Sequence, residues 1–506
     1  MSSPTSPSRR SSTARTSSFN RPKVLRTFGR IGAIGGLCGF LLYRLAPDVQ
    51  DKPLYEDEAT AGLIAMRPFG EVLDTVMLDR GGAPLHFILT HAVFWVETSA
   101  DALRWLSVAC ALAAVPLSFD LARRLAGPRA GIVSAAVVAS STALAVYGSF
   151  GRMYALFVLV AALAADLFVR AVQSRSRGAV IAAAAAAWLL PAVHPYGAIP
   201  ALVELAVAAV LWRRRSLRAA VPVALMALAA LPFLVADLRL ADRAKVSSGG
   251  DTLASPGDAW GELVAALSAF AGGDGAPFVA FTALALLGLV VVARSEPAVA
   301  AVSATVVFPP LLFLLLSAGS APDLSPRHLF YALPLWAAAI GVGASWLVRR
   351  LPAGLAAAAI AAIALGAVAS PASGLRDPRE LGLLPTRIDA SVRAGPRDLL
   401  VPYSPPFLAE LGQVRDGVAL PQGPGDLILD ALEHAGEPIS AVFVAFPGES
   451  WTVTKLEGPF DESAALSAAV EAITTKRHPP QLDWWFDLVE RGLCEALSKL
   501  GTRCPA

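Results

Sequence analysis

The stretch IGAIGGLCGFLLYRLA at residues 31–46, followed by Leu54-Tyr55-Glu56-Asp57-Glu58-Ala59, decides the class of fold. An apolar run of this kind can enter a bilayer as a helix, and several runs of about 20 residues follow it along the chain. The composition agrees: 55% of the 506 residues are hydrophobic and 16% are charged, whereas soluble proteins carry about 25% charged residues. The sequence therefore predicts an all-α polytopic membrane protein.

The positions of the apolar runs predict the topology. One apolar piece, residues 84–96, could either span the membrane or lie along its surface as an interfacial helix. The interfacial alternative puts every Arg-rich loop on one side, and cytoplasmic loops of most membrane proteins carry the Lys/Arg excess, so we prefer it. Candidate spans, about eleven in all, are residues 31–47, 101–122, 129–147, 152–172, 178–193, 196–212, 218–236, 277–294, 298–317, 328–348 and 352–370.

The start of the chain differs from the region that holds the spans. Residues 1–30 are basic and rich in Ser, Thr and Pro, which predicts a disordered N-terminus on the cytoplasmic side. Residues 31–370 form the expected membrane domain, with juxtamembrane helices in its first outer loop. The Ala-, Gly-, Pro- and Arg-rich composition suggests a bacterial source, and we therefore expect a multi-pass protein of the cell membrane.

The tail, residues 371–506, has a nearly soluble composition and is expected outside the cytoplasm as a small α/β domain. Its sequence predicts strands at 399–401 and 439–445 and amphipathic helices at 462–476 and 482–500. Cys494 and Cys504 could form a disulfide there if the tail is outside.

Two adjacent acids, Asp57 and Glu58, follow the first span. Carboxylates close to a bilayer are costly unless they stay in water or take part in chemistry. One carboxylate could deprotonate an acceptor hydroxyl or amine while an activated sugar leaves its carrier lipid, with the other orienting the acceptor or a cation. The alternative is a pair of solvated loop charges.

Further candidate residues fall on the same predicted face of the membrane. Arginines at span ends could pair with a lipid phosphate, because guanidinium donors match phosphate oxygens, or could serve as interfacial anchors. Histidines and tyrosines in the turns could line a substrate pocket, or could simply be interfacial. The candidates for donor-phosphate or substrate binding are Arg152, Tyr154, His194, Tyr196, Arg327, His328 and His86.

Other kinds of site have no support in the sequence. There is no phosphate-binding G-x-x-x-x-G-K-[ST] loop, no G-x-G-x-x-G after a strand, and no C-x-x-C or H-E-x-x-H zinc motif. No nucleic-acid partner is expected and no cofactor is required, although an acidic pair could hold a divalent cation. Asp166 and Glu204 fall within predicted spans and could serve in hydrogen bonds between helices.

Seven short motifs in a fixed order resemble the GT-C superfamily of membrane glycosyltransferases. The similarity is greatest to the branch that holds protein mannosyltransferases and aminoarabinose transferases, the bacterial glycosyltransferase 39-like proteins. The motifs are Asp57-Glu58-Ala59, Ala83-Pro84-Leu85-His86-Phe87, Leu103-Arg104-Trp105-Leu106-Ser107, Leu121-Ala122-Arg123-Arg124-Leu125-Ala126-Gly127, Gly151-Arg152-Met153-Tyr154-Ala155-Leu156, His194-Pro195-Tyr196-Gly197 and Arg327-His328-Leu329 with Leu333-Pro334.

This resemblance implies a transferase that takes a sugar from a polyprenyl-phosphate donor and acts outside the cytoplasm. The acceptor would be a cell-envelope glycan, lipid or protein. Asp57 matches the base proposed for the family, with Glu58 as its neighbour. Many relatives carry a His-Pro-Pro-Leu stretch where this chain has Gly82-Ala83-Pro84-Leu85, so a family histidine is absent or displaced to His86.

Two other functions fit a multi-span protein with few motifs. The first is a transporter or flippase of lipid-linked sugars, but such proteins commonly show repeated halves, and the sequence shows no convincing repeat. The second is a membrane scaffold without catalytic activity, whose outer tail recruits partners.

Overall fold

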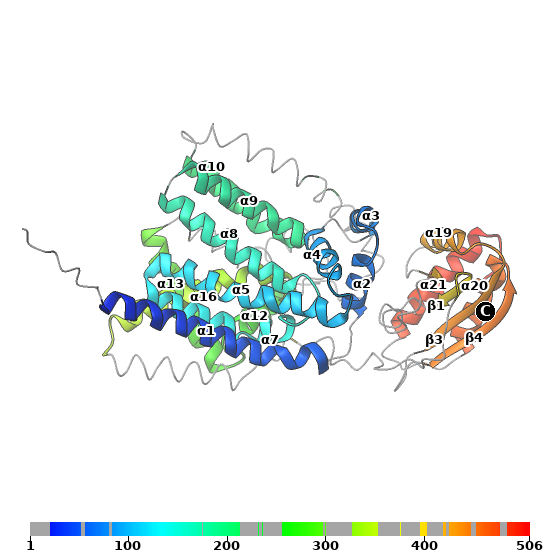
Figure 1. The fold of residues 1–506 in the computed structure, drawn as a ribbon, viewed down its shortest axis with the longest axis horizontal. Coiled ribbons are helices and arrows are strands. Elements are labelled where there is room, and N and C mark those ends of the chain that lie inside the picture. Colours follow the sequence, from blue (N-terminus) through cyan, green and yellow to red (C-terminus); the bar gives the residue numbers. More distant parts are fainter. Residues whose placement is uncertain are drawn as a thin grey trace, which may run out of the picture.

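A helical bundle and a separate small sheet make up the computed structural model of the protein (Figure 1). The structure describes residues 21–51, 56–79, 83–174, 176–212, 256–296, 326–352, 395–401, 418–420, 425–446, 452–475 and 483–505, with residues 231, 235, 299 and 375 between them.

The bundle is built from helices only. Its elements are α1 (Arg21–Asp51), α2 (Glu56–Ala65), α3 (Phe69–Asp79), α4 (Leu85–Phe94), α5 (Ala100–Ala126), α6 (Pro128–Ser140), α7 (Thr142–Tyr147), α8 (Tyr154–Ser174), α9 (Arg177–Val193), η1 (Pro195–Gly197), α10 (Ala198–Trp212), α12 (Pro256–Phe270), α13 (Ala276–Ser295), η2 (Pro326–Ala332) and α16 (Leu333–Val348).

Five helical segments of the described part are long and apolar enough to cross a bilayer. Several shorter apolar helices accompany them, among them α6, α9 and α4. The predicted spans at 218–236, 298–317 and 352–370 fall almost wholly outside the described residues, so the number of eleven stays a prediction. The five segments are Phe28–Gln50, Asp101–Ala126, Tyr154–Ser174, Ala276–Ser295 and Pro326–Val348.

Four predicted features differ from the structure. Residues 21–30, expected to belong to a disordered N-terminus, form the first part of helix α1. The span predicted at 129–147 is two helices, because Ser141 interrupts it and its hydroxyl accepts a hydrogen bond from the N–H of Leu144 to start α7. The span predicted at 328–348 begins as the 3₁₀ turn η2 before α16. Helix α12 lies between the predicted spans 218–236 and 277–294, where the sequence analysis placed no element.

Helix α16 lies in the core of the bundle, where it packs against α13, α6 and α5. Glycines permit the closest of these contacts. A Cβ at Gly343 would overlap the carbonyl oxygen of Leu284 on α13, and one at Gly288 would overlap that of Ala339 on α16. Small residues at helix crossings allow two backbones to approach, which is a common basis of packing between membrane helices.

We expect Gly343→Ala to destabilise the bundle by about 1–3 kcal/mol, because one or both helices must shift to admit the methyl group. The measurement is the midpoint of thermal unfolding of the purified protein in detergent. Gly178→Ala on α9 is the control, since a Cβ there meets open space. Equal midpoints for Gly343→Ala and wild type would contradict the close crossing.

Three short helices, α2, α3 and α4, follow α1 and share a small core of Ala61, Ile64, Val72, Val76 and Phe87. The imidazole Nδ1 of His91 lies 2.8 Å from the carbonyl oxygen of Ala65 and ties α4 to the end of α2. Short helices are thus present where the first outer loop was expected to hold them.

The tail contains a four-stranded sheet in the order β2-β1-β3-β4. Strand β1 runs parallel to β2 and β3, and β4 is antiparallel to β3. The strands and helices are β1 (Asp398–Val401), β2 (Val418–Ala419), α19 (Gly425–Ala435), β3 (Ile439–Phe446), β4 (Thr452–Phe460), α20 (Glu462–Thr475) and α21 (Asp483–Lys499).

The tail has its own hydrophobic core, distinct from that of the bundle. The predicted strands and helices agree with β1, β3, α20 and α21, whereas β2, β4 and α19 were not predicted. Cys494 of α21 is disulfide-bonded to Cys504. Placement of this domain outside the cytoplasm, and its boundary at residue 371, stay predictions.

Candidate functional site

Four segments that are distant in sequence meet at one end of the bundle. The four segments are the start of α2, the start of α8 at Tyr154 with the loop before it, η1 after α9, and η2 before α16. Helix α8 packs against η2, η1 packs against η2, and α2 packs against α5. These contacts collect the predicted residues Asp57, His86, Arg152, Tyr154, His194, Tyr196, Arg327 and His328, which we call the site cluster.

Glu58 is fully buried and forms an ion pair with Arg104 of α5. The guanidinium donates two hydrogen bonds to the carboxylate, from Nε to Oε1 at 3.0 Å and from Nη2 to Oε2 at 2.8 Å. The N–H of Gly151 donates to the same Oε1 at 2.7 Å, and Arg104 also donates to the carbonyl oxygen of Val49 at 3.0 Å. Glu58 and Arg104 together therefore join the end of α1, α2, α5 and the loop before α8.

Asp57 has a different environment from its neighbour. Its side chain is 39% exposed, and one carboxylate oxygen lies 3.9 Å from Nη2 of Arg152, whose side chain is 13% exposed. Arg152 also donates to the backbone carbonyl of Asp57 at 3.4 Å. The Glu58–Gly151 hydrogen bond fixes the loop that carries Arg152, so the buried acid sets the distance between the accessible acid and its cation.

Buried aromatic rings pack against one another next to the arginines of the site cluster. The ring centroids of Tyr147 and Tyr154 are 4.8 Å apart, and the ring of Phe330 lies 5.3 Å from that of Tyr147. Arg327 hydrogen-bonds the Tyr147 side chain and interacts electrostatically with Tyr154 and Asp57. The two arginines and the exposed acid therefore share one electrostatic environment.

Two histidines and a tyrosine continue the cluster. The His194 ring stacks on Phe157 with centroids 5.0 Å apart, and the His328 ring stacks on Tyr196 at 4.8 Å. The two imidazoles are 5.4 Å apart. Burial, followed by the positive charges of Arg152 and Arg327, lowers the pKa of His194 to about 3. This imidazole is therefore neutral at physiological pH.

His86 reaches the same place from α4 and is 1% exposed. Burial, then the charge of Arg152, lowers its pKa to about 3, against a smaller opposing effect of a hydrogen bond with the Gly151 backbone. Its Nε2 has no hydrogen-bond partner. A buried, neutral ring with an unsatisfied nitrogen is able to bind a polar group of a substrate.

Asp166 lies at the opposite end of α8, away from the site cluster. Its carboxylate is 2.8 Å from Nε of Arg124 and 2.7 Å from Nε of Arg170. Asp120 binds Arg124 and Arg170 as well, at 2.7 and 2.9 Å, and pairs with Arg123. This network ties the ends of α5 and α8 together, which fits the structural alternative for Asp166.

Glu204 belongs neither to the site cluster nor to the network of Asp120 and Asp166. It is 3% exposed on α10, and its Oε2 has no hydrogen-bond partner. The structure assigns it no role in the cluster.

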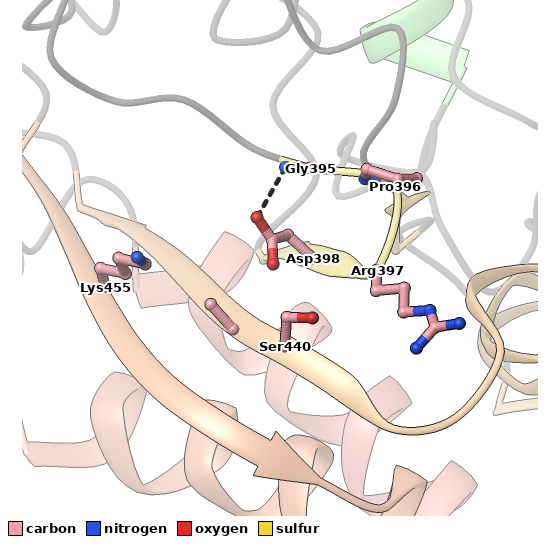
Figure 2. A pocket seen from close by; sticks show the side chains of 7 residues that line it. Gly395, Pro396, Arg397, Asp398, Ser440 and Lys455 are labelled. Carbon is pink, nitrogen blue, oxygen red and sulfur yellow. Dashed lines mark hydrogen bonds between the residues drawn. The ribbon is translucent and has the colours of Figure 1, made fainter.

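The tail contains a cavity of about 380 Å³, whose lining residues are drawn in Figure 2. The Asp398 carboxylate beside it accepts a hydrogen bond from the N–H of Gly395 at 2.6 Å, while Arg397 points away from Asp398. The acid thus closes the turn before β1 and offers little to a ligand. Among the residues that the structure describes, a partly exposed acid meets buried cations in the bundle, and we place the candidate site there.

A divalent cation fits the acidic pair poorly, because the Glu58 carboxylate is taken up by Arg104 and Gly151. Cations of this kind need several oxygen ligands. In the described parts of the chain, no group of three or more His, Cys, Asp or Glu side chains could hold a metal ion.

Three residues that hold the site together were not among the predicted site residues: Arg104, Tyr147 and Gly151. Arg104 carries a sequence signal, since it is a charged residue within the apolar run 101–122 and such residues are seldom without a function. Gly151 is the first residue of one of the seven motifs, although the motif does not indicate its contact with Glu58. Tyr147 carries no comparable signal, because its role depends on contacts with segments distant in sequence.

The chain shares its fold with solved structures of ArnT, and this agrees with the fold that the resemblance implied. ArnT from Cupriavidus metallidurans bound to undecaprenyl phosphate aligns with a TM-score of 0.52 at 13% identity, over 80% of this chain and 87% of ArnT. The apo state of ArnT aligns with a TM-score of 0.53 at 12% identity, over 83% and 93%. No family model and no curated protein matches the sequence.

Proposed function

We propose that this protein is a membrane glycosyltransferase that moves a sugar from a polyprenyl-phosphate donor to an extracytoplasmic acceptor. One observation carries the proposal: the partly exposed Asp57 lies beside Arg152 and interacts with Arg327 at one end of a GT-C fold. The undecaprenyl phosphate in the ArnT structure supports this class of donor. The acceptor would be a cell-envelope glycan, lipid or protein.

In the proposed reaction, Asp57 acts as the base and two arginines bind the leaving group. Asp57 takes the proton of the acceptor hydroxyl or amine as the acceptor oxygen or nitrogen attacks the anomeric carbon. The bond from that carbon to the phosphate oxygen breaks, and the electron pair stays on the leaving polyprenyl phosphate. Arg152 and Arg327 stabilise the charge that develops there, and attack from the opposite face inverts the anomeric centre.

The remaining residues position these groups. Glu58 supports Asp57 and Arg152 through its bonds to Arg104 and Gly151. We assign substrate contacts to the rings that lie around these groups, those of Tyr154, His194, Tyr196, His328 and His86.

The test is release of polyprenyl phosphate by the purified protein, given a panel of polyprenyl-phosphate sugars and a cell-envelope acceptor extract. The proposal expects acceptor-dependent release and a glycosylated acceptor. Movement of the lipid-linked sugar across proteoliposomes without release would instead favour a flippase. A folded protein that recruits other molecules through its tail and releases no polyprenyl phosphate would favour a scaffold.

We expect Arg152→Gln and Arg327→Gln each to weaken binding of polyprenyl phosphate by roughly 10- to 100-fold, since a hydrogen bond to a charged group contributes about 1.5–3 kcal/mol. The measurement is displacement of a fluorescent isoprenyl phosphate from the protein in detergent. Arg177→Gln is the control, because Arg177 is exposed at the other end of α9. Unchanged affinity in both site variants would remove the arginines from phosphate binding.

A further inference from the structure

The break between α6 and α7 is held in place from two sides. The hydroxyl of Ser141 accepts a hydrogen bond from the N–H of Leu144 at 3.2 Å and so starts α7. Arg44 of α1 donates to the carbonyl oxygens of Ala139 and Ser141, at 3.3 and 3.5 Å, because the last carbonyls of a helix lack partners within it. The start of α7 is therefore fixed against α6 and α1.

Tyr147, the last residue of α7, is 3% exposed. Its ring packs edge-on against three other rings, with centroids 4.8 Å from Tyr154, 5.4 Å from Phe150 and 5.3 Å from Phe330. These rings belong to α8, to the loop before it and to η2. Because a ring packed on several sides has little freedom to move, the Tyr147 hydroxyl has a defined position.

This hydroxyl accepts a hydrogen bond from Arg327, the cation of η2 that the proposed reaction assigns to the leaving phosphate. A guanidinium has five N–H donors and no acceptor, so the bond to Tyr147 leaves other donors for a ligand. The Nε of Arg327 is buried and has no hydrogen-bond partner in the part of the chain that the structure describes. Arg327 is thus held at one nitrogen, while a buried donor of the same group stays available to a phosphate oxygen.

Asp57 is a competing partner for this cation. It interacts electrostatically with Arg327, although among the described residues its ion pair, at 3.9 Å, is with Arg152. A carboxylate is a stronger partner for a guanidinium than a neutral hydroxyl is. If Arg327 turned toward Asp57, the phosphate would keep Arg152 alone, and the base would be occupied by a cation. The Tyr147 hydroxyl holds Arg327 without neutralising its charge.

We propose that Tyr147 is a positioning residue of the donor site, which keeps Arg327 directed at the leaving polyprenyl phosphate and away from Asp57. This inference rests on the proposed function, because Tyr147 acts through an arginine that binds the phosphate. It gives α7 a part in the donor site, although none of the predicted site residues lies on that helix.

The test replaces Tyr147 by Phe, which removes the hydroxyl and keeps the buried ring. We expect Tyr147→Phe to weaken binding of a fluorescent isoprenyl phosphate to the full-length protein in detergent by about fivefold, the effect of losing a typical hydrogen bond. The thermal unfolding midpoint, measured on the same preparation, should stay near that of wild type. Tyr43→Phe is the control, because Tyr43 is 80% exposed on α1, and it should change neither quantity.

A double-mutant cycle distinguishes positioning from a structural role or a direct contact with the ligand. If Tyr147 acts through Arg327, Tyr147→Phe should have little further effect on affinity in the Arg327→Gln background. Binding is compared at a temperature at which all four proteins are folded. Unchanged affinity in Tyr147→Phe would overturn the inference, and so would a loss of the same size in the Arg327→Gln background.

The same measurements separate failure of the inference from failure of the proposed function. A wild-type protein that does not bind the isoprenyl phosphate would contradict the proposed donor site, and the role of Tyr147 would fall with it. Binding that Arg327→Gln weakens and Tyr147→Phe does not would overturn only the role of Tyr147 and leave the proposed transferase intact.

Discussion

Asp57→Asn should lower the rate of sugar transfer by roughly 10²- to 10⁴-fold, the usual contribution of a positioned general base. The amide has nearly the size of the carboxylate but cannot take the acceptor's proton. Affinity for polyprenyl phosphate should not fall, because the substitution removes a negative charge next to Arg152. The measurements are single-turnover release of polyprenyl phosphate and ligand displacement on the same preparation.

Asp74→Asn is the matched control. Asp74 is an exposed acid on α3, in the same first loop. Its replacement should leave both transfer rate and stability near wild type. Equal rates for Asp57→Asn and wild type would remove Asp57 from the mechanism, whereas a loss of rate in both variants would indicate a general effect of loop charge.

Arg104→Met should destabilise the protein by about 3–5 kcal/mol, the cost of leaving one member of a buried ion pair without its partner. Glu58 would then stay buried without its guanidinium partner, close to the N–H of Gly151. We expect a large drop in the thermal unfolding midpoint in detergent, together with loss of transfer activity because Asp57 and Arg152 are no longer held at a fixed distance.

A double-mutant cycle distinguishes this role from direct catalysis by Glu58. Glu58→Gln alone should lower the unfolding midpoint, and Glu58→Gln with Arg104→Met should be less destabilised than the sum of the single variants. A Glu58→Gln protein with wild-type stability and a much reduced rate would assign Glu58 to the chemistry and contradict the supporting role.

Much of the bundle could be predicted from hydropathy. The runs at 101–122 and 152–172 correspond to α5 and α8 because an uninterrupted apolar window is sufficient to define a span. The apolar window at 129–147 predicted one span, whereas the structure has two helices that meet at Ser141. The capping hydrogen bond of a single serine does not alter average hydropathy, so the break was not predicted. Helix α12 was missed for a related reason, since the polar residues around it resemble a loop.

The sequence predicted which residues belong to the candidate site, but it did not predict which of them contact each other. Residues such as Arg152, His194 and Arg327 lie at span ends, so alternation of the spans places them on one face. Nothing in the sequence distinguishes Asp57 from Glu58 as the exposed acid. That difference arises from the contact of Glu58 with Arg104, 46 residues away, and with Gly151, 93 residues away.

The site's construction from segments far apart in the chain also fixes when it can come into existence during synthesis. Asp57 and the loop with Arg152 leave the ribosome early and can meet as soon as α5 and α8 are in the membrane. Arg327 and His328 follow only after α13 has been made. A nascent or prematurely terminated chain therefore carries the acid without its second cation, so a lipid phosphate in the same membrane finds an incomplete site until η2 and α16 have been inserted.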